Sequence, residues 1–518
     1  MRVAAIIPLL EILLAPSAHA ARPDGRHVLR AAEVAMGRIS GPADIKAMGR
    51  VHAEGRAGDY EEVMRPGDGA FVTKKRFSLF SEGEGYDGRQ HWRLDRSGAN
   101  HLLNAPYTIA STITEAWVKR RGYLDVGSGR IEGTAHQVIG DRWATILTMR
   151  PRGGNPVRLA FDDATHELLQ EQWDRSIHTV TKTYTDYRTV GRFKMPFHVE
   201  IEEEGDRSEI SISRYSRLKS SVTMWARPKF PADTKISGSA VLPIEAASFA
   251  VVGATINGHD YDFIIDTGGH NIITPAVAAA LGLVGEGNGS SGGSGEGRVA
   301  TSDTRIAELR VGSATMTDQH FTILDLDSAV KRKNKPDMAG ILGLELFERV
   351  ALTIDEPHNR LTIEPFNPRQ ACDGDAIPLM FDDDQPAVRG KIDGIPAQIG
   401  IDVGNGGIPA VLWRWGEAHK VADRFLSGVR GQGHGVGGSN TVFRTPHHDI
   451  DIGHATLADL EVAYATSKAG YFSSRADSMN LGRALLQKYV VRFDYGQGIM
   501  CVMTPKNDET VRTAAAAK

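Results

Sequence analysis

The sequence predicts a mainly β protein in which a β-rich N-terminal domain precedes two homologous β lobes. Segments that alternate apolar and polar residues recur in the first half of the chain, which is typical of strands. The second half repeats its own landmarks in the same order, which indicates an internal duplication. A chain of 518 residues is long enough for about three domains of roughly 150 residues each.

The composition is that of a globular protein with apolar cores. Hydrophobic residues make up 41% of the chain and charged residues 24%. A formal net charge of -4 gives no electrostatic reason to expect nucleic acid as a partner. After residue 20, no stretch approaches the ~18 to 20 apolar residues that a membrane-spanning helix needs, so no transmembrane span is expected.

Residues 1–20 have the pattern of a signal peptide. Met1-Arg2 is a short basic start, residues 3–15 are largely apolar, and Ala18-His19-Ala20 offers the small-x-small pattern of a cleavage site. We therefore expect an exported protein, which would be periplasmic if its source is a Gram-negative bacterium.

The chain contains two cysteines, Cys372 and Cys501. In an oxidising compartment they could form a disulfide that ties the two predicted lobes together, and the sequence leaves open whether they do. Neither lies in a recognisable nucleophile context, which disfavours a catalytic thiol.

Residues 25–220 predict one β-rich domain after a short helical start. Alternating patterns in 71–80 and 143–147 predict strands bounded by Gly and Asp turns. Residues 159–169 and 184–196 loosely resemble the half-barrels of outer-membrane lipoprotein-sorting proteins. That resemblance implies a concave sheet able to bind an apolar or extended partner, and the alternative is a β domain of another use.

Two further segments lack the pattern of a folded domain. Residues 221–245 contain Pro228, Pro231 and Pro243 without a clear period, which predicts an extended linker. Residues 505–518 end in an alanine-rich stretch and predict a disordered tail.

Residues 246–504 form a diverged tandem repeat. Each copy opens with two predicted strands joined by a hairpin-type turn, Asn257-Gly258 in the first and Asp393-Gly394 in the second. The expected strands are 249–256 and 261–265 in the first copy, and 387–392 and 396–401 in the second.

The second strand of each copy ends in an Asp-x-Gly triplet, and later landmarks keep the same spacing. Gly343 follows Asp266 by 77 residues, and Gly482 follows Asp402 by 80. Each glycine precedes a short helical segment and a strand that ends in an acidic residue 12 positions on, at 355 and 494. The repeat predicts one lobe over 246–368 and a second over 369–504.

A pair of carboxylates at the ends of two equivalent strands has a chemical use. One such aspartate is usually a turn former. Two that are related by a pseudo-twofold axis can face each other and share a proton, because like charges a few ångströms apart do not both ionise cheaply. The ionised carboxylate can then take a proton from water while the protonated one polarises a peptide carbonyl. Asp266 and Asp402 are the expected pair, and the reaction needs neither a metal nor a cofactor.

These residues resemble the retropepsin and pepsin group of aspartic proteases, especially exported bacterial proteins with retropepsin-like repeats. The resemblance spans 246–504 and is carried by Asp266-Thr267-Gly268 after 263–265 and by Ile341-Leu342-Gly343. It implies two acid-protease β-barrel lobes and an aspartic-type endopeptidase that hydrolyses extended peptides, with Asp266 and Asp402 catalytic. It also implies flap-like loops at 285–297 and 433–438. The residues that it implies as support for the catalytic loops are Thr267, Gly268, Val403, Gly404, Asn405, Gly343 and Gly482.

Two departures from the family pattern keep other functions open. Val403 replaces a Thr or Ser, so the second loop must be held by packing or by Asn405. Asn480 replaces an apolar residue before Gly482. A catalytically inactive peptide- or lipoprotein-binding module is one alternative. A homodimeric protease that uses two copies of Asp266 is another, although a monomer already supplies both aspartates.

Other motifs are weak. Residues 289–293 match G-x-S-x-G, but they lie in a glycine-rich loop and not between a strand and a helix. No Gly-Lys-Ser/Thr completes a phosphate loop, and no H-E-x-x-H or cysteine pair has zinc spacing. His447-His448-Asp449, the densest histidine cluster, is interpreted as a polar turn. No metal site is predicted.

Overall fold

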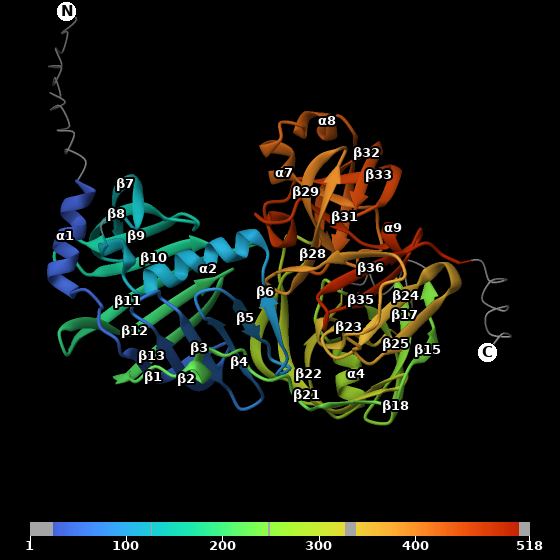
Figure 1. Cartoon of the computed structure of the whole chain (residues 1–518), viewed down its shortest axis with the longest axis horizontal. Coiled ribbons are helices and arrows are strands. Elements are labelled where there is room, and N and C mark those ends of the chain that lie inside the picture. Colours follow the sequence, from blue (N-terminus) through green and yellow to red (C-terminus); the bar gives the residue numbers. More distant parts are fainter. Residues whose placement is uncertain (1–23, 126, 247–248, 327–337, 507–518) are drawn as a thin grey trace, which may run out of the picture.

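The computed structural model describes residues 24–125, 127–246, 249–326 and 338–506 (Figure 1). The predicted signal peptide, residues 1–20, lies outside the described residues, as does 507–518 of the predicted tail. The described chain is mainly β, as predicted, with one large N-terminal sheet and two further β lobes. None of the described helices combines the length and the apolar character that crossing a membrane requires.

The N-terminal part is a single antiparallel sheet of thirteen strands, in the order β6-β5-β4-β3-β2-β1-β13-β12-β11-β10-β9-β8-β7. Nearly all neighbours in the sheet are consecutive in sequence, because short turns join them, and only the β1–β13 pair joins distant segments. The strands are β1 (Asp44–Ala53), β2 (Arg56–Met64), β3 (Phe71–Arg76), β4 (Ser81–Tyr86), β5 (His91–Leu94), β6 (Asn100–Leu103), β7 (Gly129–Ile139), β8 (Arg142–Pro151), β9 (Val157–Asp162), β10 (Leu168–Asp174), β11 (Thr179–Val190), β12 (Phe193–Glu203) and β13 (Asp206–Leu218).

Two helices pack against this sheet. The helical start is present as α1 (Gly25–Met36), and α2 (Pro106–Lys119) follows β6 and leads into the short η1 (Gly122–Leu124). Helix α2 was not expected from the sequence, since its many threonines and isoleucines favour strands. Trp117 and Val118 of α2 are buried with strand residues such as Phe161, so packing outweighs the local preference.

The two lobes have equivalent sheets. Lobe 1 has nine strands, with the path β14-β22-β19-β23-β18-β17-β21-β20 and β16 paired to β17. Lobe 2 has eight, in the order β27-β28-β29-β34-β30-β33-β32-β31. The lobe 1 strands are β14 (Thr234–Ile236), β16 (Glu245–Ala246), β17 (Ala250–Ile256), β18 (His259–Ile265), β19 (Ile272–Ile273), β20 (Glu286–Ser291), β21 (Val299–Val311), β22 (Ala314–Leu324) and β23 (Gly340–Leu342). The lobe 2 strands are β27 (Met380–Asp382), β28 (Gln385–Ile392), β29 (Ile395–Ile401), β30 (Ala410–Leu412), β31 (Val429–Gly435), β32 (Gly438–Ile452), β33 (Ala455–Ala465) and β34 (Met479–Leu481).

The predicted repeat is visible in this topology. The hairpins β17–β18 and β28–β29 turn at Asn257-Gly258 and Asp393-Gly394, where all four residues have the positive φ of a two-residue hairpin turn. In each lobe the second strand of the hairpin then pairs in parallel with the strand that ends just before Gly343 or Gly482. The short helices of the lobe region are α3 (Val222–Trp225), α4 (Pro275–Ala280), α6 (Leu344–Phe347), η2 (Glu356–His358), α7 (Trp413–Ala418), α8 (Ala422–Leu426), η3 (Gly470–Ser473) and α9 (Arg483–Leu486).

A six-stranded sheet joins the lobes, in the order β15-β25-β24-β35-β36-β26. Its strands are β15 (Ala240–Pro243), β24 (Ala351–Asp355), β25 (Arg360–Glu364), β26 (Asp375–Pro378), β35 (Val490–Asp494) and β36 (Ile499–Met503). At its centre β24 of lobe 1 pairs with β35 of lobe 2. Residues 221–245, expected as an extended linker, carry α3 and three short strands that pair with β22, β25 and β17.

The two cysteines form a disulfide in this shared sheet. Cys372 lies just before β26 and is bonded to Cys501 of β36, with a Cα–Cα distance of 5.7 Å. The bond fastens the segment between the lobes to β36, the last of the described strands. It suits an oxidising compartment.

Removing this disulfide should lower stability, since it closes a loop of 129 residues. We expect Cys372→Ser to reduce the free energy of unfolding by about 2 to 4 kcal/mol. Urea unfolding with and without dithiothreitol measures this. The reductant should bring the wild type to the level of the variant and leave the variant unchanged; equal sensitivity of both proteins would contradict a stabilising bond.

Candidate active site

Asp266 and Asp402 stand at equivalent places, directly after β18 and β29. The backbone N–H of Asp266 donates to the carbonyl of Leu342 at 3.1 Å, and that of Asp402 donates to Leu481 at 2.8 Å. Each turn is therefore fixed by the parallel neighbour of its own strand. The two lobes deliver the two carboxyl groups in the same way.

The glycine of each triplet lies against the aspartate of the other lobe. A Cβ atom at Gly268 would fall 2.7 Å from Cγ of Asp402, and one at Gly404 would fall 2.2 Å from Cγ of Asp266. Real Cβ atoms do not approach that closely, so both positions require glycine. The two carboxyl groups are hydrogen-bonded to each other.

The pair is electrostatically asymmetric. Burial raises the pKa of Asp266 well above its ordinary value of 3.8, and the charge and hydrogen bond of Asp402 raise it further. The N–H groups of Gly268 and Gly404 lower it, without cancelling the rise. Of the two carboxyl groups, Asp266 is therefore the one whose protonated form the site favours.

Thr267 joins the two loops beneath the carboxyl groups. Its buried hydroxyl donates to the carbonyl of Ile401 at 2.7 Å and accepts the N–H of Val403 at 3.0 Å. Val403 is buried, and its loop is held both by packing and by this bond from the other lobe. One threonine thus braces the turns of both lobes.

Asn480, which departs from the family pattern, contacts the pair directly. Its side-chain N–H donates to Oδ2 of Asp402 at 2.6 Å, and its Oδ1 accepts the side-chain N–H of Asn405 at 2.7 Å. Asn405 also donates its backbone N–H to the carbonyl of Asp402 at 2.9 Å. The sequence marked Asn480 as a departure but did not indicate that it would hold the Asp402 carboxylate.

Gly343 and Gly482 pack behind the loops. A Cβ at Gly343 would lie 2.2 Å from the carbonyl oxygen of Gly269, and one at Gly482 would lie 2.3 Å from that of Asp402. Both glycines are required by close backbone approach. In lobe 1 this approach is accompanied by a hydrogen bond from Leu344 N–H to the Gly269 carbonyl, at 2.8 Å.

The two glycine-rich loops form hairpins whose tips meet. The lobe 1 hairpin is β20–β21, called the lobe 1 flap here (residues 285–303), and the lobe 2 hairpin is β31–β32. Gly295 and Gly297 donate their N–H groups to the carbonyls of Val436 and Gly437 at 2.9 and 2.8 Å. The flaps therefore close on one another by backbone hydrogen bonds between the lobes.

Half-buried Tyr471 and buried Asp477 form a pair close to the lobe 2 loop, and the sequence did not indicate them. The Tyr471 hydroxyl donates to Asp477 at 2.8 Å and occupies the space where a Cβ of Gly400 would lie. Burial raises the pKa of Asp477 to about 6. Tyr471 also donates its backbone N–H to Gly293 of the lobe 1 flap at 3.0 Å.

Among the described residues, Asp95, His101 and Glu348 could offer ligand atoms to one cation, since these atoms lie within 4.8 Å of one another. His101 is already placed between Glu348, at 2.9 Å, and Asp384, at 3.2 Å. Burial lowers the pKa of His101, but the hydrogen bonds to these two carboxylates raise it to about 10. A protonated imidazole between carboxylates accounts for this cluster, which also includes His270, bonded to Glu345 at 2.9 Å.

The histidine cluster at 447–449 corrects one sequence interpretation. These residues lie within β32 at a bulge in its pairing with β33, and not in a separate turn. His448 is buried between Asp393, at 2.8 Å, and Thr445, at 2.9 Å. Its two ring nitrogens are therefore hydrogen-bonded to the β28–β29 turn and to β32 itself.

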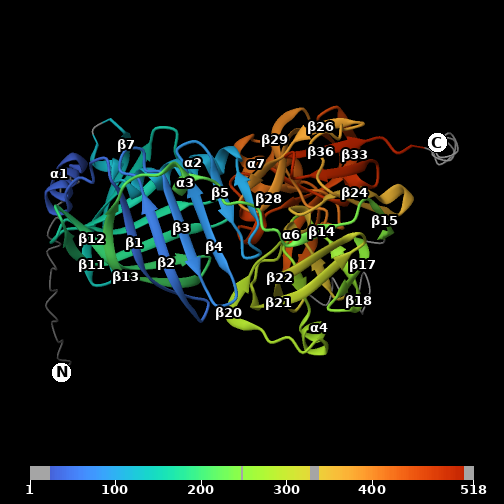
Figure 2. The same ribbon diagram turned by 60° about the horizontal axis from the view of Figure 1, so that its bottom comes forward.

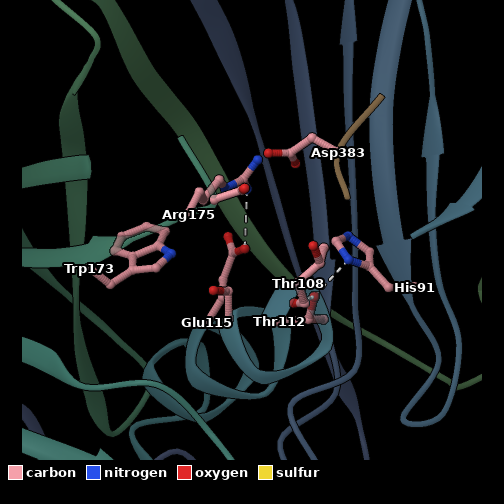
Figure 3. Close-up of a pocket in the computed structure, with 9 residues that line it drawn as sticks. His91, Thr108, Thr112, Glu115, Trp173, Arg175 and Asp383 are labelled. Carbon is pink, nitrogen blue, oxygen red and sulfur yellow. Dashed lines mark hydrogen bonds and ion pairs between the residues drawn. The ribbon is translucent and has the colours of Figure 1, made fainter. Parts of the chain in front are cut away.

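A small polar cavity lies where the N-terminal sheet and α2 meet lobe 2 (Figure 3). Arg175 approaches Glu115 at 3.4 Å, and His91 is hydrogen-bonded to Thr112 at 2.7 Å, while the Asp383 carboxylate of lobe 2 lies beside the Arg175 guanidinium. The cavity measures about 10 Å³, which is room for about one water molecule. It is a feature of the interface and too small for a substrate.

Solved structures with a similar chain path include an aspartic proteinase from Irpex lacteus, at 12% identity over 52% of this chain and 98% of that one, with a TM-score of 0.37. Another is edgp, at 10% identity over 52% and 95%, with a TM-score of 0.30. A DUF1329 family protein from Desulfovibrio piger matches at 11% identity over 37% and 91%, with a TM-score of 0.27. Such identities and TM-scores say nothing about activity.

Comparison with curated protein sequences found no match. The family model described as "Aspartyl protease" matches residues 252–346. This span begins in β17, includes the Asp266-Thr267-Gly268 turn and Gly343, and ends in α6. The chain therefore carries a domain of the aspartyl protease family in its first lobe.

Proposed function

We propose that this protein is an aspartic-type endopeptidase that hydrolyses extended peptides between its two lobes. The observation that carries the proposal is the hydrogen-bonded pair of Asp266 and Asp402, in which each carboxyl group lies over the glycine of the other lobe. One chain supplies both groups, so the proposal needs no second subunit. Peptide or protein is the proposed substrate class, and the enzyme itself would be exported to an oxidising compartment such as the periplasm.

The roles of the two aspartates follow from their electrostatic difference. Asp402 is the base, taking a proton from the attacking water, while Asn480 and Asn405 hold its side chain and loop. Asp266, which keeps its proton, is the acid and donates toward the peptide carbonyl oxygen. A peptide lying extended between the flaps and the pair would use backbone hydrogen bonds for affinity and alternate side chains for specificity.

Either Asp266→Asn or Asp402→Asn should abolish cleavage, because the pair acts as one acid–base unit. We expect at least about a thousandfold loss of kcat/KM in each variant. Peptide-library cleavage followed by mass spectrometry from pH 3 to 8 measures it, with Asp260→Asn, an exposed carboxylate on β18, as the matched control.

Three results would contradict parts of this proposal. Loss with Asp266→Asn alone would favour the homodimer that uses two copies of Asp266. Activity retained in both variants would place catalysis elsewhere. No cleavage by a folded wild type at any pH would favour the inactive peptide- or lipoprotein-binding module.

The raised pKa of Asp266 also predicts a pH-dependent stability difference. Because its pKa is higher in the folded state than in the unfolded state, its stabilising contribution is present at low pH and is lost as pH rises through the folded pKa. Asp266→Asn cannot ionise, so its melting temperature relative to wild type should be higher at pH 8 than at pH 4. Differential scanning calorimetry at both pH values tests this without any substrate, and a constant difference would show that burial and Asp402 do not raise the pKa.

Thr267→Val should loosen both loops, since it leaves the Ile401 carbonyl and the Val403 N–H without their buried partner. We expect a loss of about 2 to 4 kcal/mol in the free energy of unfolding, from two unsatisfied groups. Thr267→Ser keeps the hydroxyl and is the control, with a smaller loss expected. Urea unfolding compares the two; a loss in Thr267→Val no larger than that in Thr267→Ser would contradict a stabilising role for the hydroxyl.

A further inference from the structure

The stem of the lobe 1 flap has an unusual composition for a structure that must hold one shape. Residues 285–297 are largely glycine and serine, and glycine loses more conformational entropy on ordering than any other residue does. Such a sequence does not order itself. Its order has to come from contacts with other parts of the chain.

Those contacts come from the ends of the N-terminal strands. Figure 2 shows β20 beside the lower ends of β1 to β4. The Asn288 N–H donates to the carbonyl of Glu54, in the β1–β2 turn, at 2.9 Å. The Ser78 hydroxyl donates to Glu286 at 3.0 Å, so two different turns of the N-terminal sheet hold this one short strand.

The β12–β13 turn holds the other side of the stem. The Ser290 hydroxyl donates to Asp206 at 2.9 Å. Arg298, the residue just before β21, forms ion pairs with both Glu204 and Asp206 at 2.5 Å. Contacts therefore flank the tip, residues 292–297, on both of its strands.

The innermost contact is a buried ion cluster around Asp303 of β21. Arg56 of β2 reaches Asp303 at 2.5 Å, and these two side chains are 7% and 3% exposed. Arg96 reaches the same carboxylate at 3.0 Å, as does His320 of β22. Burial raises the pKa of Asp303, but the hydrogen bonds from His320 and Arg56 and the charge of Arg96 outweigh it and keep the pKa below its usual range.

Arg56 also touches the glycine stem directly. A Cβ at Gly287 would lie 2.5 Å from Cζ of Arg56, and Gly287 has a φ of +83°, so a larger residue would both strain the backbone and displace the guanidinium. The Phe80 ring packs against the guanidinium groups of Arg56 and Arg96 at 5.0 and 4.6 Å. Removing one member of such a buried cluster leaves uncompensated charge.

We propose that the N-terminal sheet is part of the peptide-binding apparatus, with Arg56 as a positioning residue that holds the lobe 1 flap over the aspartate pair through Asp303. This inference rests on the proposed endopeptidase function. Whereas the N-terminal sheet holds the stem of the flap, lobe 2 holds its tip through the N–H groups of Gly295 and Gly297. A peptide can enter when the tip leaves lobe 2, while the stem stays ordered and little entropy is lost on binding.

The experiment compares the full-length wild type with Arg56→Gln and Asp303→Asn. In hydrogen–deuterium exchange, amides of 286–291 and 299–303 should exchange about tenfold faster or more in both variants, because the stem loses its buried anchor. In peptide cleavage, KM should rise about tenfold with kcat changed less than about twofold, since the flap binds the peptide and does not react. Arg56→Lys keeps the charge and should lie between wild type and Arg56→Gln.

Arg475→Gln is the matched control. Arg475 of lobe 2 also pairs with the N-terminal domain, at Asp174 and 2.9 Å, but it does not contact the flap. Its exchange in the stem and its KM should equal those of the wild type. Comparable loosening by this variant would mean that any weakening of the interface suffices, and would refute a specific role for Arg56.

Two other outcomes overturn the proposal. Unchanged exchange in Arg56→Gln and Asp303→Asn would show that the stem is ordered without the anchor. A KM that falls in these variants would show that the anchor restrains substrate entry. Exchange is read without substrate, so a wild type that cleaves nothing would refute the endopeptidase function while the exchange result still decides whether Arg56 holds the flap.

Discussion

The contact between two carboxyl groups of different lobes is the constraint on which the rest of the protease-like half depends. Asp266 and Asp402 approach closely enough for each to lie where a side chain on the other lobe's glycine would be. Such a contact is electrostatically unfavourable unless one group keeps its proton. The backbone bonds from Leu342 and Leu481, the Thr267 brace and the shared six-stranded sheet all keep the lobes in the relative position that this contact requires.

The two lobes are related, but each supplies a different kind of side chain to the Asp266–Asp402 pair. Lobe 1 supplies the threonine that braces both turns, while lobe 2 has a buried valine at the equivalent place. Lobe 2 supplies Asn480, which donates to Asp402, where lobe 1 has Ile341. Duplication followed by divergence has therefore produced an asymmetric pair, and asymmetry is what separates an acid from a base.

The N-terminal sheet contacts the lobes in several places. Strand β6 ends against Phe381 of β27, with backbone bonds from Asn104 and Ala105 at 3.2 and 3.1 Å. The β10–β11 turn meets the segment at 473–475, where Arg475 donates to Ser176 at 2.9 Å. Together with the ion cluster at Asp303, these contacts pack the N-terminal sheet against both lobes and against the lobe 1 flap. A half-barrel tethered by a free linker would not have this arrangement.

Local patterns determined much of the architecture. Period-two alternation, the Asn-Gly and Asp-Gly turns and the spacing of 77 and 80 residues predicted two equivalent β lobes, because strands and tight hairpins depend mainly on neighbouring residues. The same patterns identified Asp266, Asp402 and their glycines. They did not predict α2, whose residues prefer strands locally and become helical through packing against the sheet.

Only the tertiary structure decided which side chains from distant segments contact each other. Asn480 binding Asp402, Tyr471 approaching Gly400 and Arg56 reaching Asp303 join residues up to 247 positions apart, and no spacing rule encodes such contacts. The pairing of Cys372 with Cys501 was likewise left open by the sequence, because disulfide formation depends on the distance between Cα atoms in the folded chain. The sequence by itself determined the strands, their turns and the two candidate carboxylates. Only the folded chain decided which groups orient those carboxylates and which hold the flap, since burial and charge are properties of the neighbours that folding brings together.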